Sequence, residues 1–278
     1  MRLWCMVLAF LMIAVLVVGA CAKPAPASPA PAPVTSAPAP TPPKEEMAKH
    51  VSMACTATGT TYIMATAVTT LLNRHTKIEA SHEVFSGTFA MFQRLTTGEA
   101  DLVAISPLAP TAGMYGELGS EWLKIRLRLL CSGSEASMSW CGIFTRPDTG
   151  IKKVADLRGK LWYADQAGTP QWGQLSRGAL KANGMTKDDV KWRVATTGPD
   201  AQKDIIEKRV DAWTYLLGTG TIEMAQTCGL FIVPLTLAEQ AAIAEVNPAY
   251  IPAVVKKGDR GANADTPIVA SPTSIWIS

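Results

Sequence analysis

Short apolar strand-like segments alternate with helix-like segments along most of this chain, and this alternation constrains its fold more than any other feature. An apolar run at 51–55 and an alternating, strand-like segment at 77–84 each lead through a small polar loop into a helical pattern, at 62–74 and 89–97. Further strands are expected at 102–105, 125–130, 138–144, 161–164, 191–195 and 212–216, and a further helix at 199–209. Repeated strand–loop–helix units are typical of α/β proteins with largely parallel sheets.

The alternation divides the chain into two α/β halves. The first half is expected to span 49–145 and the second 146–234, and the segment 235–278 is expected to return to the first half. The body that follows residue 48 contains 278 − 48 = 230 residues, which is enough for one large domain or two small ones.

The N-terminus has the pattern of an export signal. One cation, Arg2, precedes an apolar run of 16 residues, 3 to 18, and the small residues Gly19 and Ala20 come just before Cys21. These are the parts of a secretory signal peptide, and a small-residue run that ends in Cys resembles the bacterial lipobox. The alternative is an uncleaved membrane anchor, but a spanning helix needs about 20 apolar residues. The sequence predicts a signal peptide at 1–21, lipidation of Cys21, and an extracytoplasmic body anchored to a membrane.

Residues 22–48 read as a linker. They are rich in Ala, Pro, Ser and Thr, and nine of the 19 prolines lie between Pro24 and Pro43. Such a segment cannot bury a core and favours extended polyproline conformations, so it predicts a semi-rigid tether. A proline-rich ligand for a partner domain is the alternative. The net charge of +3 indicates no nucleic-acid partner.

Four cysteines remain in the body: Cys55, Cys131, Cys141 and Cys228. They permit two disulfides in an exported chain, with three possible connectivities, or they are small buried thiols. Cys131 and Cys141 form the first pair to test. No Cys or His spacing matches a zinc site, so neither a metal nor a cofactor is expected.

The loops that follow the strands carry the chemical information. Thr56–Thr61, Ser86–Thr88 and Ala167–Thr169 each place Gly, Ser or Thr just before a helix. Free N–H groups at a helix start carry partial positive charge, and together with hydroxyl groups they favour an anion such as a carboxylate. Ordinary helix capping is the alternative role for each loop. The predicted ligand-binding residues are Thr58, Gly59, Thr60, Thr61, Tyr62, Ser86, Gly87, Thr88, Gly168, Thr169, Gly218 and Thr219.

Other side chains could take part in the same site. Aromatic residues near these loops, namely Tyr62, Trp172, Trp213 and Tyr215, could pack against a solute, although Trp213 on a strand is better placed for core packing. A rival account holds the anion with an arginine, and Arg94, Arg146 and Arg193 are the candidates for this role.

The order of these segments resembles the TAXI family of solute receptors, which serve TRAP transporters. The loop at 55–62 is similar to that family's Thr-Gly-Gly-Thr-Gly-Gly-x-Tyr, and Ser86-Gly87-Thr88 matches its Ser-Gly-Ser/Thr. Similar segments follow at 98–102, at 148–160 and at 250–253. The ordered matches cover about 50–270, but Gly is replaced in the first loop by Thr56, Ala57 and Thr60, and the third loop lacks a fuller Gly-Ser-Gly-Thr.

The resemblance implies a two-lobed periplasmic-binding-protein-like fold of type II, with a ligand held between the lobes. The implied function is capture of a small organic anion, an amino acid or another carboxylate, and its delivery to a TRAP-type permease. The chain ends after a strand-like 274–277, where relatives continue, so the sequence predicts that the C-terminal part of the first lobe is truncated.

Two other function classes can be weighed. A ligand-binding module that feeds a membrane sensor would have the same sequence features. An exported hydrolase would need a nucleophile, but no Gly-x-Ser-x-Gly elbow or Ser/His/Asp order is present, so no enzyme activity is expected.

Overall fold

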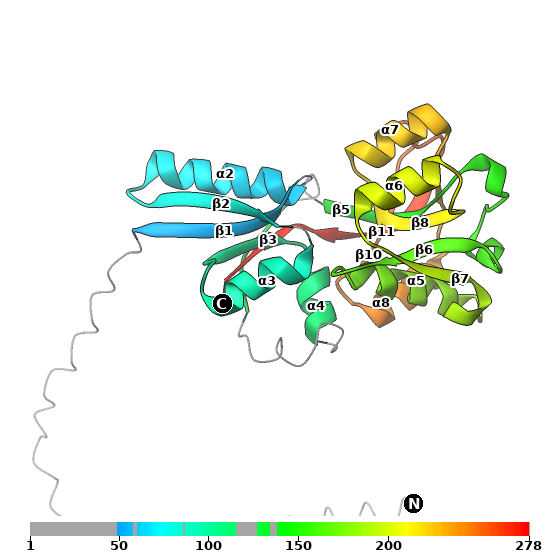
Figure 1. Ribbon diagram of the computed structural model, residues 1–278, viewed down its shortest axis with the longest axis horizontal. Helices are drawn as coiled ribbons and strands as arrows, with labels where there is room; N and C mark the ends of the chain where they lie inside the picture. Colours follow the sequence, from blue (N-terminus) through cyan, green and yellow to red (C-terminus); the bar gives the residue numbers. More distant parts are fainter. Residues whose placement is uncertain (1–48, 58–59, 86, 115–126, 134–137, 278) are drawn as a thin grey trace, which may run out of the picture. The chain divides into compact units, whose positions relative to one another are not determined.

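The computed structural model describes residues 49–57, 60–85, 87–114, 127–133 and 138–277 (Figure 1). All of these residues belong to one compact unit of the chain, 47–278. The predicted signal peptide, Cys21 and the linker 22–48 lie outside the described residues. Within the described part, no helix combines the length and apolar character needed to span a bilayer.

The first sheet has five strands in the order β2-β1-β3-β12-β4. Their bounds are β1 His50–Thr56, β2 Glu79–Phe85, β3 Leu102–Ile105, β4 Arg128–Ser132 and β12 Ser274–Ile277. β1 pairs in parallel with β2 and β3, whereas β12 runs antiparallel to β3 and β4. The last strand of the described chain therefore lies between two strands that come from its first half.

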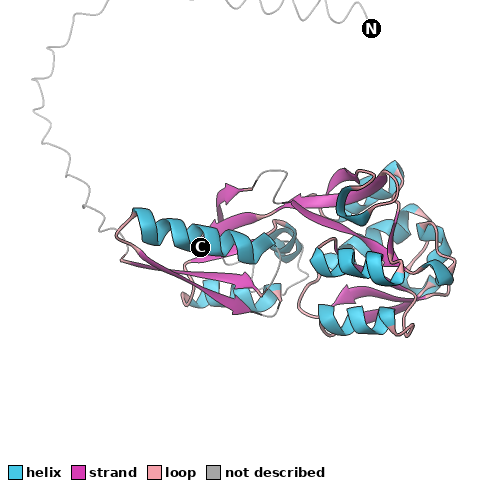
Figure 2. Cartoon of the chain, turned by 90° about the horizontal axis from the view of Figure 1, so that it is seen from above, coloured by secondary structure: helices cyan, strands magenta, loops and turns pink. Residues whose placement is uncertain are grey.

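Helices cover both faces of this sheet because its central strands are apolar on both sides. Helix α2 (Thr60–His75) packs over Met53 and Cys55 of β1, and helix α3 (Thr88–Thr97) packs over Ala54 and Val103 on the opposite face. Alternate residues of a strand point to opposite faces, so β1 supplies both clusters. A short helix, α4 (Leu108–Met114), follows β3. Figure 2 shows helices on both sides of the strands.

The second sheet has the order β10-β11-β5-β8-β6-β7, and β9 pairs with β5. The strands are β5 Met138–Thr145, β6 Leu161–Gln166, β7 Lys191–Ala195, β8 Ala212–Leu216, β9 Phe231–Val233, β10 Ile251–Val255 and β11 Thr266–Pro272. β6 pairs in parallel with β7 and β8, and the remaining pairs are antiparallel.

Helices also cover both faces of the second sheet. Helices α5 (Gln171–Ala182) and α8 (Leu237–Val246) share one apolar cluster, and α6 (Gly198–Ile206) and α7 (Thr219–Cys228) share another. A glycine permits the close approach of α5 to α8, because a Cβ on Gly178 would lie 2.5 Å from the Cα of Ile243. Short 3-10 helices occur at 147–149, 154–157, 187–189 and 259–261, the last of which is η6.

Membership of the two sheets differs from the expected boundaries. β5 belongs to the second sheet, although 49–145 was assigned to the first half, because its backbone pairs with β8 and β11. Most of 235–278 also belongs there, since α8 packs on α5 and the β10–β11 hairpin extends the sheet. Only β12 returns to the first sheet, and a single residue, Thr273, separates it from β11.

Candidate functional site

The predicted loops follow strands whose carboxyl ends meet at one edge of each sheet. In the first sheet, the parallel strands β1 and β2 lead into α2 and α3. In the second sheet, the parallel strands β6 and β8 lead into α5 and α7. Ligands of open α/β sheets bind outside such carboxyl ends, so the topology favours a site at these helix starts.

Two of the predicted loops touch each other, although about 80 residues separate them in sequence. The backbone N–H of Phe89 donates to the carbonyl oxygen of Gly168 over 3.4 Å. Nε2 of Gln171 lies 3.5 Å from the Thr88 hydroxyl oxygen. Gly87 has φ 90°, and a Cβ on it would lie 3.6 Å from the Gly168 carbonyl oxygen. The structure therefore brings Gly87–Thr88 and Gly168–Thr169 together.

The first predicted loop lies beside Thr273, the residue at which the chain passes from β11 of the second sheet to β12 of the first. The hydroxyl of Thr60 is 3.0 Å from the hydroxyl of the buried Thr273, and the hydroxyl of Thr61 pairs with that of Thr56. Tyr62 packs against His82 edge to face, with 5.4 Å between the ring centroids. These hydroxyls have partners within the protein. Thr58, Gly59 and Ser86 lie outside the described residues.

The fourth predicted segment forms the start of α7. Gly218 is the N-cap residue, and its N–H donates to the hydroxyl of Thr221 over 2.9 Å. Among the hydrogen bonds given by the described residues, none joins Gly218 or Thr219 to the other loops. The structure thus brings together only some of the predicted ligand-binding residues.

Aromatic rings lie next to the contact between the loops. Trp172 is 5.7 Å from Tyr215, and Tyr215 stacks on Trp213 at 4.2 Å, both measured between ring centroids. Trp213 is buried and packs near Phe144, as its place on a strand predicted. Burial raises the pKa of Tyr215, which keeps its phenol neutral at ordinary pH.

The start of α5 holds polar groups that sequence reasoning did not single out. Gln171 and Gln174 are buried, yet Oε1 of Gln171 and Nε2 of Gln174 have no partner among the described residues. Nε1 of the buried Trp172 also lacks one. Buried polar groups are normally hydrogen-bonded, so unpaired ones in a helix start are suited to receive a ligand or water. The signal available in the sequence was a pair of Gln residues, three positions apart, just after a Gly-Thr-Pro loop.

None of the three candidate arginines forms a hydrogen bond or ion pair with these loops among the contacts of the described residues. Arg146 is buried and donates to the carbonyl oxygens of Ile205 and Val210. Arg94 pairs with Glu99 and lies over the ring of Phe85. Arg193 is exposed on β7. The rival account therefore finds no support from these three residues.

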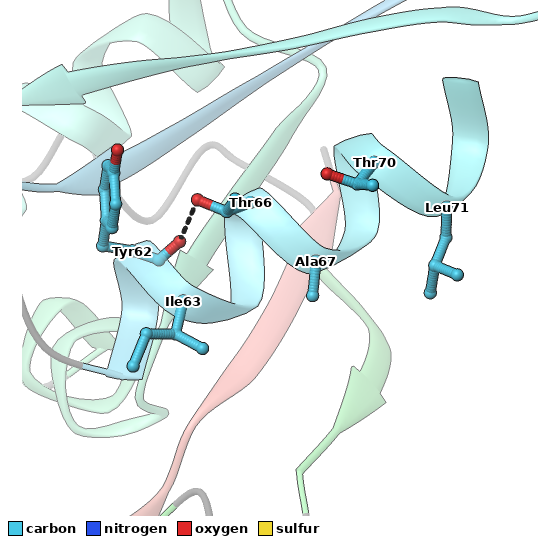
Figure 3. A pocket seen from close by; sticks show the side chains of 6 residues that line it. All are labelled: Tyr62, Ile63, Thr66, Ala67, Thr70 and Leu71. Atoms are coloured by element: carbon cyan, nitrogen blue, oxygen red, sulfur yellow. Dashed lines mark hydrogen bonds between the residues drawn. The ribbon is translucent and has the colours of Figure 1, made fainter. Parts of the chain in front are cut away.

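A shallow surface depression of about 490 Å³ lies along α2 (Figure 3). It is lined by Tyr62, Ile63, Thr66, Ala67, Thr70 and Leu71. Ile63 and Leu71 are largely exposed, and the Thr66 hydroxyl is satisfied by the carbonyl oxygen of Tyr62 (Figure 3). An open apolar face without converging polar groups cannot orient a small solute.

The four body cysteines are free thiols, and Cys131 and Cys141 lie in different sheets. Burial raises the pKa of Cys55 and Cys141, which opposes formation of the thiolate that a nucleophile needs. Within the described residues, no cluster of His, Cys, Asp or Glu could hold a metal ion.

Comparison with solved structures identifies the fold as that of two-lobed periplasmic binding proteins. The chain is similar to the periplasmic aliphatic sulphonate-binding protein SsuA of Escherichia coli, with 20% identity, a TM-score of 0.52, and coverage of 67% of this chain and 57% of that one. It is also similar to the alkanesulfonate-binding protein SsuA of Xanthomonas axonopodis pv. citri bound to MOPS, with 14% identity, a TM-score of 0.52, and coverage of 83% and 65%.

A third structure, named as the periplasmic sulfonate-binding component of an ABC transporter from Methylobacillus flagellatus KT, matches with 15% identity and a TM-score of 0.50, and the match covers 83% of this chain and 61% of that one. The match thus spans less than two thirds of each of these structures. The chain itself belongs to the NMT1-like family, which matches residues 53–277.

Proposed function

We propose that this chain is an extracytoplasmic solute-binding lipoprotein, which captures a small organic anion between two lobes and delivers it to a membrane permease. The observation that carries the proposal is the contact of Gly87–Thr88 with Gly168–Thr169, because it joins helix starts from the two sheets. Each lobe is one sheet with its helices. The fold, which is that of periplasmic binding proteins, supports the same reading.

The chemistry of the helix starts favours an anionic group. The first N–H groups of α3 and α5 have no partner within their own helix, and each helix start carries partial positive charge. A solute carboxylate that accepts from both helices would draw the lobes together. Closure can signal occupancy only if the solute binds the closed state better than the open one.

The resemblance to TAXI receptors supports a TRAP-type permease as the partner and an amino acid or another carboxylate as the solute. The sulfonate-binding proteins that share the fold favour a second candidate, an ABC-type importer of a sulfonate. Direct comparison of a carboxylate and a sulfonate of similar size in a binding experiment separates the two.

The sequence before the body supplies the anchor in this proposal. Lipid on Cys21 would hold the N-terminus at the membrane, and the Pro-rich residues 22–48 would hold the body away from it. Labelling of the wild type with a radioactive fatty acid, and its loss in Cys21→Ser, checks this part.

Removing single hydroxyl groups from the proposed site should weaken solute binding. Thr61→Ala, Ser86→Ala and Thr169→Ala are each expected to raise the dissociation constant about tenfold to a hundredfold, since a hydrogen bond to a charged group contributes about 1.5–3 kcal/mol. Calorimetry with L-glutamate, succinate and ethanesulfonate measures the change. Thr227→Ala removes an exposed hydroxyl from the far end of α7 and should bind like the wild type. Wild-type affinity in all three site variants would contradict the site.

A further inference from the structure

We infer that Arg260 and Trp140 form an oxyanion-binding subsite beside the start of α7. This inference rests on the proposed function and names the side chains that recognise the anionic group of the solute. It adds a positively charged partner to a site that the sequence had described only by hydroxyl groups and helix starts.

Arg260 and Trp140 lie close together beside the start of α7. Cζ of Arg260, in η6, lies 5.4 Å from the centroid of the Trp140 ring. The carbonyl oxygen of Trp140 accepts from the N–H of Leu217 over 2.7 Å, and Leu217 directly precedes the N-cap residue Gly218. Helix α7 also contacts η6. A guanidinium, an indole and a helix start are therefore neighbours.

Trp140 lies near one end of β5 in the second sheet. Cys141, next to Trp140 in β5, pairs with Leu216 at the carboxyl end of β8. Trp140 therefore lies at the same edge of the second sheet as the end of β8. This is the edge at which the loops before α5 and α7 begin, so the subsite adjoins the proposed solute site.

Two buried nitrogen donors of this group lack a hydrogen-bond acceptor among the described residues. Trp140 is 8% exposed, and its Nε1 has no partner among the described residues. Nε of Arg260 is also buried without a hydrogen bond, although it forms an ion pair with Asp259, whose Oδ2 lies 3.7 Å away. The first turn of α7 contains no acidic residue. Indole and guanidinium nitrogens donate and cannot accept, so the missing partner is an acceptor, and negative charge suits it best.

The backbone of Arg260 has an unusual conformation. Arg260 has φ 49° and is one of two non-glycine residues with positive φ in the described ranges, the other being Lys208. Left-handed backbone is unfavourable for a residue with a Cβ, and it is found where the surroundings fix it, often at ligand sites. Here Arg260 takes this conformation while its side chain lies across Trp140. The ligand chemistry is a planar or tetrahedral oxyanion, a carboxylate or a sulfonate.

Full-length protein titrated with L-glutamate, succinate, ethanesulfonate and, as an uncharged solute, D-xylose tests the inference by calorimetry. Arg260→Gln removes the charge but keeps the Cβ, and it should weaken binding of the best anion about tenfold to a hundredfold, because the lost hydrogen bonds are charge-assisted. Arg260→Lys should recover part of this loss. Trp140→Phe keeps an aromatic ring near the guanidinium but removes Nε1–H together with one ring of the indole, and it should cause a smaller loss of about tenfold.

Arg209→Gln is the matched control, because it removes an exposed arginine from the same lobe, and it should bind like the wild type. Wild-type affinity in Arg260→Gln would overturn the inference while leaving the proposed function intact. An equal loss for D-xylose and for the anions would show a structural role only and would also overturn it. Binding of D-xylose alone would overturn the oxyanion subsite and leave solute binding standing, whereas no binding of any of the four solutes would count against both.

Discussion

Replacing Arg146 with Met should lower the free energy of unfolding by about 3 kcal/mol, because two buried carbonyl oxygens would lose a charged donor. Arg146 is 5% exposed, and its Nη1 donates to Ile205 over 2.7 Å and to Val210 over 2.6 Å. These carbonyls flank the turn between α6 and β8, so the guanidinium fixes the path of the chain into the strand. Met has similar length and fills the space without donating.

Urea unfolding followed by tryptophan fluorescence measures this change. Arg209→Met is the matched control, because Arg209 is exposed and forms ion pairs with Asp204 and Glu207. Surface ion pairs contribute less than about 1 kcal/mol, so this variant should stay within that range. Equal losses in the two variants would show that the buried carbonyls do not depend on Arg146.

Replacing Asn247 with Leu should cost a similar amount, about 3 kcal/mol, because three hydrogen bonds of a buried side chain would be lost at nearly constant volume. Asn247 is fully buried, and its Nδ2 donates to the Leu108 carbonyl over 3.0 Å and to Oε1 of Gln174 over 2.7 Å. Its Oδ1 accepts from the N–H of Ala249. The amide therefore joins α4, which follows the first sheet, to α5 of the second.

Asn183→Leu is the control for this variant. Asn183 is the C-cap residue of α5, and its Nδ2 donates to the Ala179 carbonyl oxygen and to Glu239 of α8, but it is only partly buried. Water can replace its partners, so its loss should be about 1 kcal/mol. Chemical unfolding of both variants compares them directly. A smaller loss for Asn247→Leu than for Asn183→Leu would contradict the role given to the buried amide.

Local pattern predicted the elements of the parallel regions well. The segment 102–105 forms β3 as expected. The expected helices at 62–74 and 89–97 lie within α2 and α3. Apolar runs and glycine stops act over a few residues, so they can be read from sequence. Helix α4 was not expected from the sequence, and Pro107 and Pro110 lie just before it and in its first turn, where Pro is tolerated.

Sheet membership could not be predicted in the same way. The strand at 138–145 is apolar whichever sheet it joins, and only its pairing with β8 and β11 decides between them. The same holds for the hairpin of β10 and β11. Non-local pairing has no signature in the local pattern, which is why the expected return of 235–278 to the first half was largely wrong.

The candidate site was predictable as a set of loops but not as an arrangement. Glycine and hydroxyl residues before helices identified Gly87, Thr88, Gly168 and Thr169, and the structure brings these four together. The sequence could not show which arginine lies near the site, because the partners of a guanidinium depend on which segments the fold brings close to it. Arg146 proved to hold buried carbonyls, and Arg260, which no motif indicated, lies over Trp140.

Hydrogen exchange of the full-length protein, with and without the best-binding solute, tests the central claim that the solute lies between the two lobes. The account predicts slower exchange in two peptides at once, one covering 87–92 and one covering 167–174. A solute held between the lobes would stabilise the contact in which the Phe89 N–H donates to the Gly168 carbonyl oxygen. Exchange along the exposed face of α2 at 63–74 should stay unchanged. Protection confined to one of the two peptides, or found only along α2, would contradict a solute held between the lobes.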